Sequence, residues 1–396
     1  MAAMLTNPAA YPFAGSGEVN LPPEFAKLRA APGLTRVEMP HGGAAWLATR
    51  AQDVKALLID RRFSRELANQ PDQPRLTYEV LPPGSISALD GPDHSRVRRF
   101  VAAEFTKRRV SDYARKADEI AGELISRMTA NPGPEDFVSA IAYSFPLLMI
   151  CEIIGVPAED RSRFEGLLSD LRSWHRPTSD SRSMLEDYMD ELIELRMQRE
   201  HHDLLGALVG AHKAGADLTR HELLNIGIAL LAGGVGTPAS FISTATYLLL
   251  EDTARWDELR SKPDRVAAIL EELLRYIPIG VGGGKMRVAS EDVELGGTMV
   301  KKGEAVLPVM TSADRDPDAF PDPDAINLFR EPKQHFAFGM GTHRCLGSQL
   351  ARMELLVLFS NLVRRLPYLR LAGTAEDVVW SAGDVVLGPR TLLVRW

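Results

Sequence analysis

The sequence predicts a mainly helical protein with small β-sheets, arranged as a single α+β domain over residues 1–396. Two observations lead to this fold class. Stretches with apolar residues at spacings of three and four are longer and more numerous than stretches with strand-like patterns. The strand-like stretches do not alternate regularly with helices, which argues against a doubly wound parallel sheet. No repeat or Gly/Ser linker divides the chain, and we expect residues 1–20 to form a loosely ordered N-terminal extension.

Five long stretches are predicted to be helices because each carries one apolar face. They cover 114–128, 184–200, 220–251, 263–276 and 346–366. Short strands are expected where β-branched residues or an alternating pattern occur. These strands cover 44–48, 286–295, 300–309 and 392–396.

The composition excludes several classes of protein. A net charge of −7 argues against general nucleic-acid binding, and 396 residues suffice to bury a large cofactor. The two cysteines, Cys151 and Cys345, are too few for a disulfide framework or a zinc ribbon, which favours a reducing compartment. The first basic residue is Lys27, and the longest apolar runs are shorter than the ~20 residues that span a bilayer. We therefore expect a soluble cytoplasmic protein without a membrane or nucleic-acid partner.

A glycine-rich loop surrounds Cys345 directly ahead of the last long helix. In Phe338-Gly-Met-Gly-Thr-His-Arg-Cys-Leu-Gly347, the glycines allow tight turns and the close approach of a flat partner. The helix that follows directs its N-terminal amides toward the sulfur, which favours a thiolate. Thiolate is one of the axial ligands that proteins supply to haem iron. The alternative, a buried structural cysteine, is the better interpretation of Cys151 in its apolar run.

This loop resembles the haem-binding loop of the cytochrome P450 family, because every fixed position of Phe-Gly-x-Gly-x-His-x-Cys-x-Gly is present. The chain is identified as a member of the soluble bacterial type of this family. The resemblance implies the P450 fold, with haem b between a distal and a proximal helix and Cys345 as the axial ligand of the iron. It also assigns Phe338, Gly339, His343 and Gly347 to the haem-binding loop.

Glu272-Leu-Leu-Arg275 resembles the family's Glu-x-x-Arg pair, and its spacing places both side chains on one helix face. Such a pair alone indicates little, because similar pairs are common on protein surfaces. Here it precedes Arg330 and the cysteine loop in the family's order. The resemblance therefore implies that Glu272, Arg275 and Arg330 brace the cysteine loop.

Four basic residues resemble the family's contacts with the haem propionates. His94 and Arg98 are spaced i,i+4 on one helix face, and Arg287 and His343 occupy the other two positions that the resemblance implies. Propionates are carboxylates, which arginine holds by charge-assisted hydrogen bonds. The alternative for each residue is an ordinary basic side chain on the surface.

The stretch 231–239 resembles the family's distal helix, with Thr237 at the position of a threonine that serves the oxygen chemistry. Gly236 stands where the family usually has an acid. Because Pro238 removes a backbone N–H and glycines weaken a helix, we expect a kink or opening here. The alternative for Thr237 is a hydroxyl bonded back to a carbonyl one turn earlier. Without the acid, we expect substrate groups or ordered water to help Thr237 deliver protons.

The resemblance implies a haem-thiolate monooxygenase. The alternative is oxidative ring formation or aryl coupling without oxygen insertion. A third hypothesis is a sensor that binds haem but catalyses no reaction. The segment 234–239 also matches a dinucleotide fingerprint, which would indicate a nicotinamide-dependent enzyme without haem. Only 12 residues separate Ala239 from the acid Glu251, too few for the helix, turn and strand which that fingerprint needs.

Positions where the family contacts substrates are mostly small or apolar here, as in a pocket for a drug-sized molecule. We expect a bulky, partly aromatic natural product as the substrate. The glycines over 280–284 either leave room for it or only serve a turn. The individual candidates for substrate contacts are Ser87, Trp174, Val235, Gly283 and Val386.

The resemblance also implies a monomeric enzyme that uses dioxygen. Its electrons would come from NAD(P)H through a separate ferredoxin or flavodoxin and its reductase. Six basic residues between Arg96 and Arg109 face a single acid, Glu104. This stretch is either a solvated helix face or, with Arg344 and Arg352, a docking face for an acidic partner.

Overall fold

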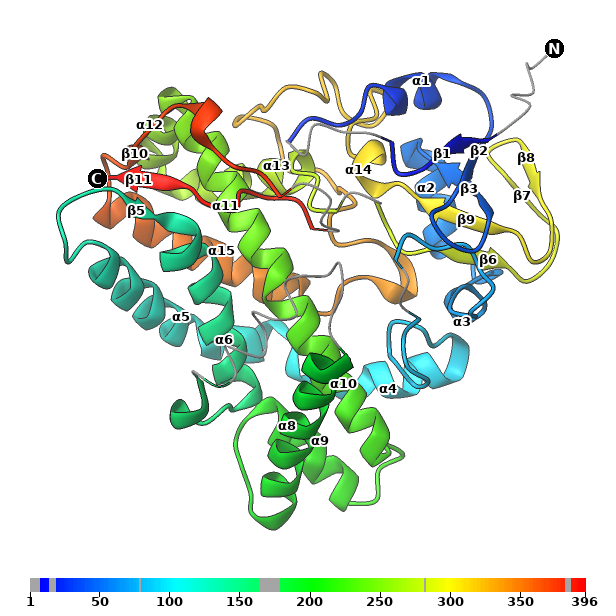
Figure 1. Cartoon of the computed structure of the whole chain (residues 1–396), viewed down its shortest axis with the longest axis horizontal. Helices are drawn as coiled ribbons and strands as arrows, with labels where there is room; N and C mark the ends of the chain where they lie inside the picture. Colours follow the sequence, from blue (N-terminus) through cyan, green and yellow to red (C-terminus); the bar gives the residue numbers. More distant parts are fainter. Residues whose placement is uncertain are drawn as a thin grey trace.

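A computed structural model of the chain describes residues 8–13, 19–77, 80–161, 163, 179–280, 283–381 and 386–396. Helices dominate these residues, as the sequence predicts (Figure 1). The α-helices are α1 Glu24–Ala30, α2 Ala51–Ile59, α3 Arg65–Ala68, α4 Gly91–Glu104, α5 Lys107–Met128, α6 Ser144–Ile154, α8 Ser179–Gln198, α9 Leu204–Lys213, α10 Arg220–Gly234, α11 Gly236–Glu251, α12 Thr253–Ser261, α13 Val266–Tyr276, α14 Met310–Ala313 and α15 Ser348–Arg365. A π-helical turn, Val138–Tyr143, precedes α6.

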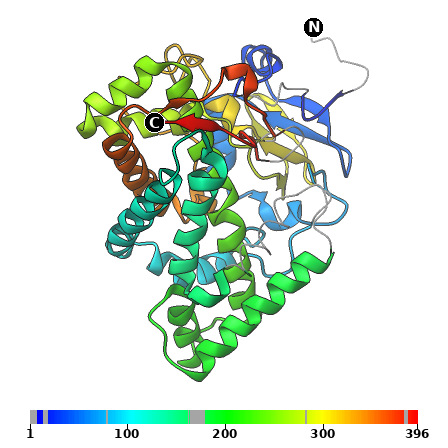
Figure 2. The same ribbon diagram turned by 60° about the vertical axis from the view of Figure 1, so that its left-hand side comes forward.

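The strands form three small sheets. The largest has the order β1-β2-β3-β9-β6-β4, the second has the order β10-β11-β5, and β7 pairs with β8. The strand bounds are β1 Ala9–Ala10, β2 Thr35–Glu38, β3 Ala44–Ala48, β4 Phe63–Ser64, β5 Glu135–Asp136, β6 Arg287–Ala289, β7 Val293–Leu295, β8 Thr298–Val300, β9 Ala305–Pro308, β10 Arg370–Leu371 and β11 Leu393–Arg395. The largest sheet lies at one end of the molecule and most helices at the other (Figures 1 and 2).

Several predicted elements need correction. The stretch 286–295 contains two strands, β6 and β7, and 300–309 includes the end of β8 and all of β9. The turns between these strands use Gly296, Gly297 and Gly303 at φ of 59°, 82° and 85°, where glycine is favoured. Helix α6 is absent from the predictions because most of its residues are apolar and buried, so no polar face reveals its period.

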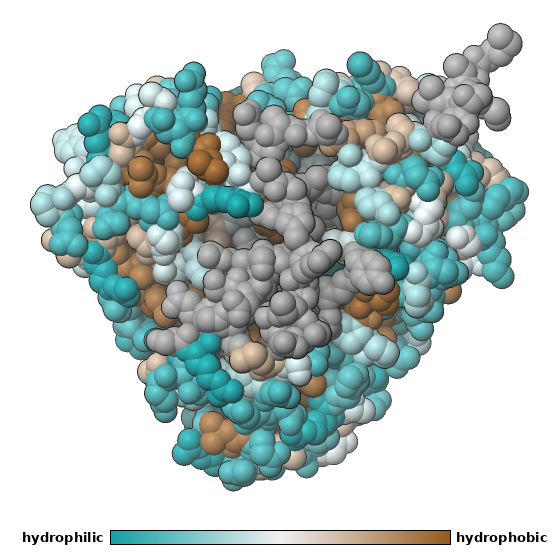
Figure 3. Space-filling view, in the orientation of Figure 1, coloured by the Kyte–Doolittle hydropathy of each residue, from teal (hydrophilic) through white to brown (hydrophobic). Residues whose placement is uncertain are grey.

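Helices α10 and α11 pass through the middle of the molecule (Figures 1 and 2). Among the described residues, the stretch Arg220–Glu251 is the one long and apolar enough to cross a membrane by length and composition, but 50% of its most apolar window is buried inside the protein. Every residue from Ala239 to Leu250 is buried. We therefore place this stretch in the core. Figure 3 shows a largely hydrophilic surface with scattered apolar patches on the visible face outside the grey region.

Part of the N-terminal stretch is held against the largest sheet. Strand β1 pairs with β2 in parallel, and the Tyr11 N–H donates to the Glu38 carbonyl at 2.9 Å. The Tyr11 ring is buried and packs edge-on against Phe13 and Phe25. The expectation of a loose extension is therefore wrong for residues 8–13, whereas 1–7 and 14–18 lie outside the described residues.

Candidate functional site

The loop that carries Cys345 is shaped by its own backbone. The Cys345 N–H donates to the Phe338 carbonyl at 2.8 Å, and Gly339 and Gly341 adopt φ of 64° and 71°. A Cβ on Gly341 would lie 2.3 Å from the Leu58 carbonyl oxygen, so this position requires glycine for close packing as well. Gly347 has an ordinary φ of −76°, and a Cβ there would lie 4.0 Å from the Cys345 sulfur.

Cys345 is an exposed residue of this loop, although protein atoms surround much of its sulfur. Burial by the surrounding protein raises its pKa, while the Gly347 N–H and the guanidinium groups of Arg98, Arg344 and Arg352 lower the pKa less strongly. The amide is thus directed at the sulfur as predicted, but the protein alone does not favour the thiolate. A metal ion that coordinates a thiol supplies the missing stabilisation of the deprotonated form.

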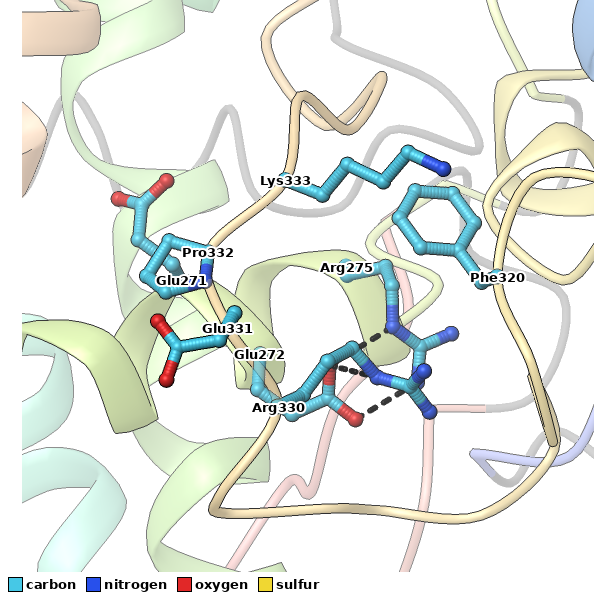
Figure 4. Close-up of a pocket in the computed structure, with 8 residues that line it drawn as sticks. All are labelled: Glu271, Glu272, Arg275, Phe320, Arg330, Glu331, Pro332 and Lys333. Carbon is cyan, nitrogen blue, oxygen red and sulfur yellow. Dashed lines mark hydrogen bonds and ion pairs between the residues drawn. The ribbon is translucent and has the colours of Figure 1, made fainter.

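The predicted brace is present and buried (Figure 4). The Arg275 guanidinium donates to both carboxylate oxygens of Glu272 at 2.8 Å, and Arg330 Nε donates to Glu272 Oε2 at 2.9 Å. Arg275 also donates to the carbonyls of Asp314 and Pro323, both at 2.8 Å. Burial opposes ionisation of Glu272, but the hydrogen bonds and positive charges that act on its carboxylate outweigh this effect and lower its pKa. The brace therefore ties α13 to the segment 314–330, which leads into the cysteine loop.

Arg352 takes part in a second ion pair beside the brace. Its guanidinium donates to Glu271 at 2.6 and 2.9 Å and lies over the Phe338 ring at 4.5 Å. His335 bonds the same carboxylate at 3.1 Å. Burial opposes ionisation of Glu271, but these partners lower its pKa to about 2. Arg352 therefore contacts the cysteine loop and is half-buried, and its pairing with Glu271 leaves less free charge for the docking face expected from the sequence.

The four predicted propionate contacts come from three parts of the chain, α4, β6 and the cysteine loop, and the charges of the other three act on His94. The rings of His94 and His343 lie 4.1 Å apart, and Arg98 donates to the Arg344 carbonyl at 2.5 Å. Burial lowers the pKa of His94 to about 4, with further lowering by the charges of His343, Arg98 and Arg287. Burial likewise lowers the pKa of Arg287 to about 10.

Two of these groups lack hydrogen-bond partners within the part of the chain that the structure describes. His94 Nε2 is buried and unpaired, and no side-chain hydrogen bond or ion pair forms at the buried Arg287 guanidinium. Such groups are costly unless a further partner satisfies them. A group that carries carboxylates and accepts a thiolate fits this cluster, and haem has propionates and an iron atom. The residues therefore fit the cofactor that the resemblance implies.

Sequence reasoning missed Asp90 and Arg65 beside this cluster. Asp90 bonds His343 Nε2 at 3.2 Å and accepts the backbone N–H groups of Arg65 and Glu66 at 2.6 and 2.9 Å. Although burial alone would raise the pKa of Asp90, these bonds hold it well below its ordinary value. The Arg65 guanidinium is buried and donates to the Ser87 and Met286 carbonyls. Because its acceptors are backbone atoms, no sequence motif marks Arg65.

The distal helix is interrupted where the sequence predicts. Helix α10 ends at Gly234, Val235 has φ −115° and ψ −64°, and α11 begins at Gly236. Thr237 is exposed, and no hydrogen bond of its hydroxyl to a described residue is found, so the back-bonded alternative does not hold. A Cβ on Gly236 would meet nothing within 4 Å. Position 236 could therefore accommodate the Cβ of a larger residue without contact with the described protein atoms.

The candidate substrate residues have different environments. Val386 pairs with Gly280, and the Leu387 carbonyl accepts a hydrogen bond from Ser240 of α11, so the C-terminal segment lies beside the distal helix. Val235 is buried in the apolar core, and Ser87 is half-buried. Trp174 lies outside the described residues.

The glycines near 280–284 are explained by packing where the structure describes them. A Cβ on Gly283 would lie 2.8 Å from Val309 Cα, and a Cβ on Gly284 would lie 2.8 Å from the Pro308 oxygen. The Gly284 N–H donates to that same oxygen at 2.7 Å. These two glycines therefore allow a close backbone approach, which favours the turn over the interpretation that they leave room for substrate.

Comparisons with known proteins identify the family of the chain. The family model for cytochrome P450 matches residues 264–369. The chain is 42% identical to nocardicin C N-oxygenase of Nocardia uniformis subsp. tsuyamanensis, with 99% of each chain covered. It is 38% identical to mycinamicin IV hydroxylase/epoxidase of Micromonospora griseorubida, with 98% of this chain and 99% of the relative covered. It is also 38% identical to a biflaviolin synthase of Streptomyces coelicolor, over 94% of this chain and 93% of the relative.

Solved structures show the same fold. A crystal structure of HinD with NMFT and NO has a TM-score of 0.93 at 38% identity, with 98% of this chain and 99% of that chain covered. A cytochrome P450 with biaryl coupling reactivity has a TM-score of 0.91 at 34% identity, with 96% of this chain and 98% of that chain covered. The loop, its brace and these relatives over nearly the whole length show that the chain belongs to the cytochrome P450 family.

Proposed function

We propose that this P450 oxidises a bulky, partly aromatic natural product in the cytoplasm, with haem b held by Cys345. The observation that carries this proposal is the exposed residue Cys345 near four converging basic side chains, among which the buried His94 Nε2 has no hydrogen-bond partner among the described residues. When bound, thiolate-ligated haem iron supplies the oxygen activation. Arg287, Arg98, His94 and His343 would hold the propionates. The chain's own residues would orient the substrate and supply protons.

The first test is the carbon monoxide difference spectrum of the reduced protein. A thiolate-ligated haem is expected to give the spectrum characteristic of P450 enzymes. Absence of haem after expression with a haem precursor would contradict the proposal. A haem protein that consumes no reducing equivalents with any substrate would indicate a sensor instead of an enzyme.

Hydroxylation and oxidative coupling both remain open for the reaction. Relatives of both kinds occur, a hydroxylase/epoxidase and a P450 with biaryl coupling reactivity. Product mass separates the two reactions, because monooxygenation adds one oxygen whereas coupling removes two hydrogens. We propose monooxygenation, and titration with a panel of aromatic peptides, polyketides and fatty acids would test the substrate class. Tight spectral binding of fatty acids alone would contradict a bulky aromatic substrate.

We propose that Thr237 acts with ordered water or a polar group of the substrate to deliver protons. The open space at Gly236 and the Thr237 hydroxyl, which bonds to no described residue, support this arrangement, since water or substrate can occupy the place of the family's acid. Gly236→Asp is sterically feasible and is expected to leave the coupling of electron use to product unchanged or lower. A several-fold rise in coupling with the same product would contradict the proposal.

Electrons are proposed to come from NAD(P)H through a ferredoxin or flavodoxin and its reductase. The docking face proposed from the sequence is smaller than expected, because Arg96 pairs with Glu222 at 2.6 Å and Arg352 pairs with Glu271. Exposed cations remain at Arg99, Lys107, Arg108 and Arg344, and Arg109 is exposed but pairs with Glu104 at 3.5 Å. Reduction by an acidic partner is expected to slow as salt rises, because salt screens charges beyond about 10 Å at 0.1 M. Rates independent of ionic strength would contradict this docking mode.

A further inference from the structure

The loop from Leu81 to Leu89 has no regular secondary structure, yet its backbone is held at several points. It starts with two prolines and Gly84, whose φ of 76° favours glycine. Local turns form where Ser85 N–H donates to the Pro82 carbonyl at 3.1 Å and Ala88 N–H donates to the Ser85 carbonyl at 2.8 Å. Ile86 is buried in the same apolar cluster as Val235 of the distal helix. Ile86 therefore anchors the loop in the apolar core that also contains Val235.

Two side chains of α10 hold the middle of this loop. Asn225 Nδ2 donates to the Pro83 carbonyl at 2.9 Å, and His221 Nε2, one turn earlier, bonds the same oxygen at 3.1 Å. Because the carbonyl only accepts, the His221 nitrogen is the donor. Asn225 is 6% exposed, and a Cβ on Gly84 would lie 3.4 Å from its Nδ2. The loop and α10 thus approach closely at this contact.

Side chains from the sheet end of the molecule hold the two ends of the loop. Asn69 donates to the Leu81 carbonyl at 2.9 Å and accepts the Leu81 N–H at 3.0 Å. Arg65 donates to the Ser87 carbonyl through Nε and Nη2 at 3.0 and 2.8 Å. The third arm of Arg65 reaches the Met286 carbonyl at 2.6 Å, next to Arg287. The loop is therefore hydrogen-bonded to Arg65, close to the predicted propionate contacts, and to Asn225 of the distal helix α10.

We propose that Asn225, assisted by His221, is a positioning residue that fixes the loop 81–89 as one wall of the substrate site. The identity of the site as a substrate site rests on the proposed function. The hydrogen bond between Asn225 and the Pro83 carbonyl does not depend on that function. Asn69 and Arg65 hold the ends of the loop to the sheet side, so the Pro83 contact is its hydrogen-bonded link to α10 among the described residues. Loosening this link would let the wall open and admit bulky ligands faster.

Hydrogen exchange of the haem-loaded protein tests the proposal directly. In Asn225→Leu, which keeps a similar volume but removes the donor, amides over 84–89 are expected to exchange about fivefold faster, the change that loss of one net hydrogen bond produces. His221→Ala is expected to give a smaller increase at the same amides. Unchanged exchange over 84–89 in Asn225→Leu would overturn the proposal.

Asn361→Leu is the matched control, because Asn361 is a buried asparagine of α15 that donates to Asp118 at 2.8 Å, far from the loop in the sequence. It is expected to leave exchange over 84–89 at the parent rate. An equal increase in the exchange rate in both variants would mean general destabilisation and would contradict a local role of Asn225 in fixing the loop.

Ligand entry provides the functional measurement. Association of a triaryl-substituted imidazole with the haem is expected to quicken about fivefold in Asn225→Leu, whereas imidazole itself is expected to associate at the parent rate. Equal changes for both azoles would overturn the role of the wall in admission. Haem-free protein would give no azole signal and would contradict the proposed function, while its exchange pattern would still report on the Asn225 contact.

Discussion

Two contacts hold irregular backbone in different ways. One is the brace of Glu272, Arg275 and Arg330 beneath the cysteine loop, and the other is the latch, the bonds from Asn225 and His221 to the Pro83 carbonyl of loop 81–89. The brace uses charged groups, with Glu272 and Arg275 side chains each 2% exposed. The latch uses a neutral amide and an imidazole that bond one carbonyl at the edge of solvent. Removing one member of a buried ion pair leaves an uncompensated charge, whereas losing a neutral bond to an accessible carbonyl is mild. We infer that the proximal side is fixed by the fold and that the distal wall is adjustable.

The largest effect is expected at the thiol itself. Cys345→Ser is expected to abolish both the thiolate spectrum with carbon monoxide and the activity, because serine does not provide the sulfur ligand. Cys151→Ser is the control, since that residue is buried in the apolar core away from the loop, and both properties are expected to persist. A normal spectrum in Cys345→Ser would remove the basis of the proposed function.

The next largest effect is expected in the brace. Arg275→Ala leaves the buried Glu272 with Arg330 and the Asn327 N–H as partners and is expected to lower the free energy of unfolding by about 3–5 kcal/mol, measured by denaturant titration. Arg260→Ala is a suitable control because its pair with Asp257, at 3.6 Å, is exposed, and surface pairs contribute about 0–1 kcal/mol. Equal losses in the two variants would break the contrast between buried and exposed pairs.

A smaller effect is expected in the propionate cluster. Arg287→Met is expected to speed haem loss about tenfold or more, because a hydrogen bond to a charged group contributes about 1.5–3 kcal/mol. The measurement is the rate of haem transfer to an excess of a haem-free acceptor protein. Arg36→Met, which removes an exposed arginine from the same sheet, is expected to leave the rate unchanged. Parent-like haem loss in Arg287→Met would place the propionates elsewhere.

The smallest effect is expected in the acid stability that Glu271 contributes. Its pKa falls from an ordinary value of 4.5 to about 2 in the folded protein, so the unfolded chain binds its proton first as pH falls. The carboxylate therefore contributes stability above pH 4.5 that is lost as the pH falls from 4.5 toward 2. Glu271→Gln is expected to be less stable at pH 7 and to lose stability less steeply over that window. Identical slopes in urea titrations at a series of pH values would contradict the assignment.

Contiguous motifs in the sequence predicted the proximal site well. The cysteine loop and the Glu272–Arg275 pair depend on short, fixed spacings, and the break at Val235 follows from local Gly and Pro content. The ion pairs of Arg96 and Arg352 were not predicted, because their acidic partners lie 126 and 81 positions away. Asp90, Arg65 and Asn225 were missed for a related reason. They bond backbone N–H or carbonyl groups of distant segments, and a backbone partner leaves no trace in residue type.

The carbonyl bonds of loop 81–89 have a consequence for how specificity changes over evolution or by design. Leu81, Pro83 and Ser87 are held through their main-chain oxygens. The half-buried side chain of Ser87 can therefore be exchanged without loosening the attachments of the loop, whereas Ile86 and Ala88 are buried and belong to the packing. Substitutions at Ser87 are expected to vary substrate preference while most variants still fold, which makes this position a natural place to redirect the enzyme.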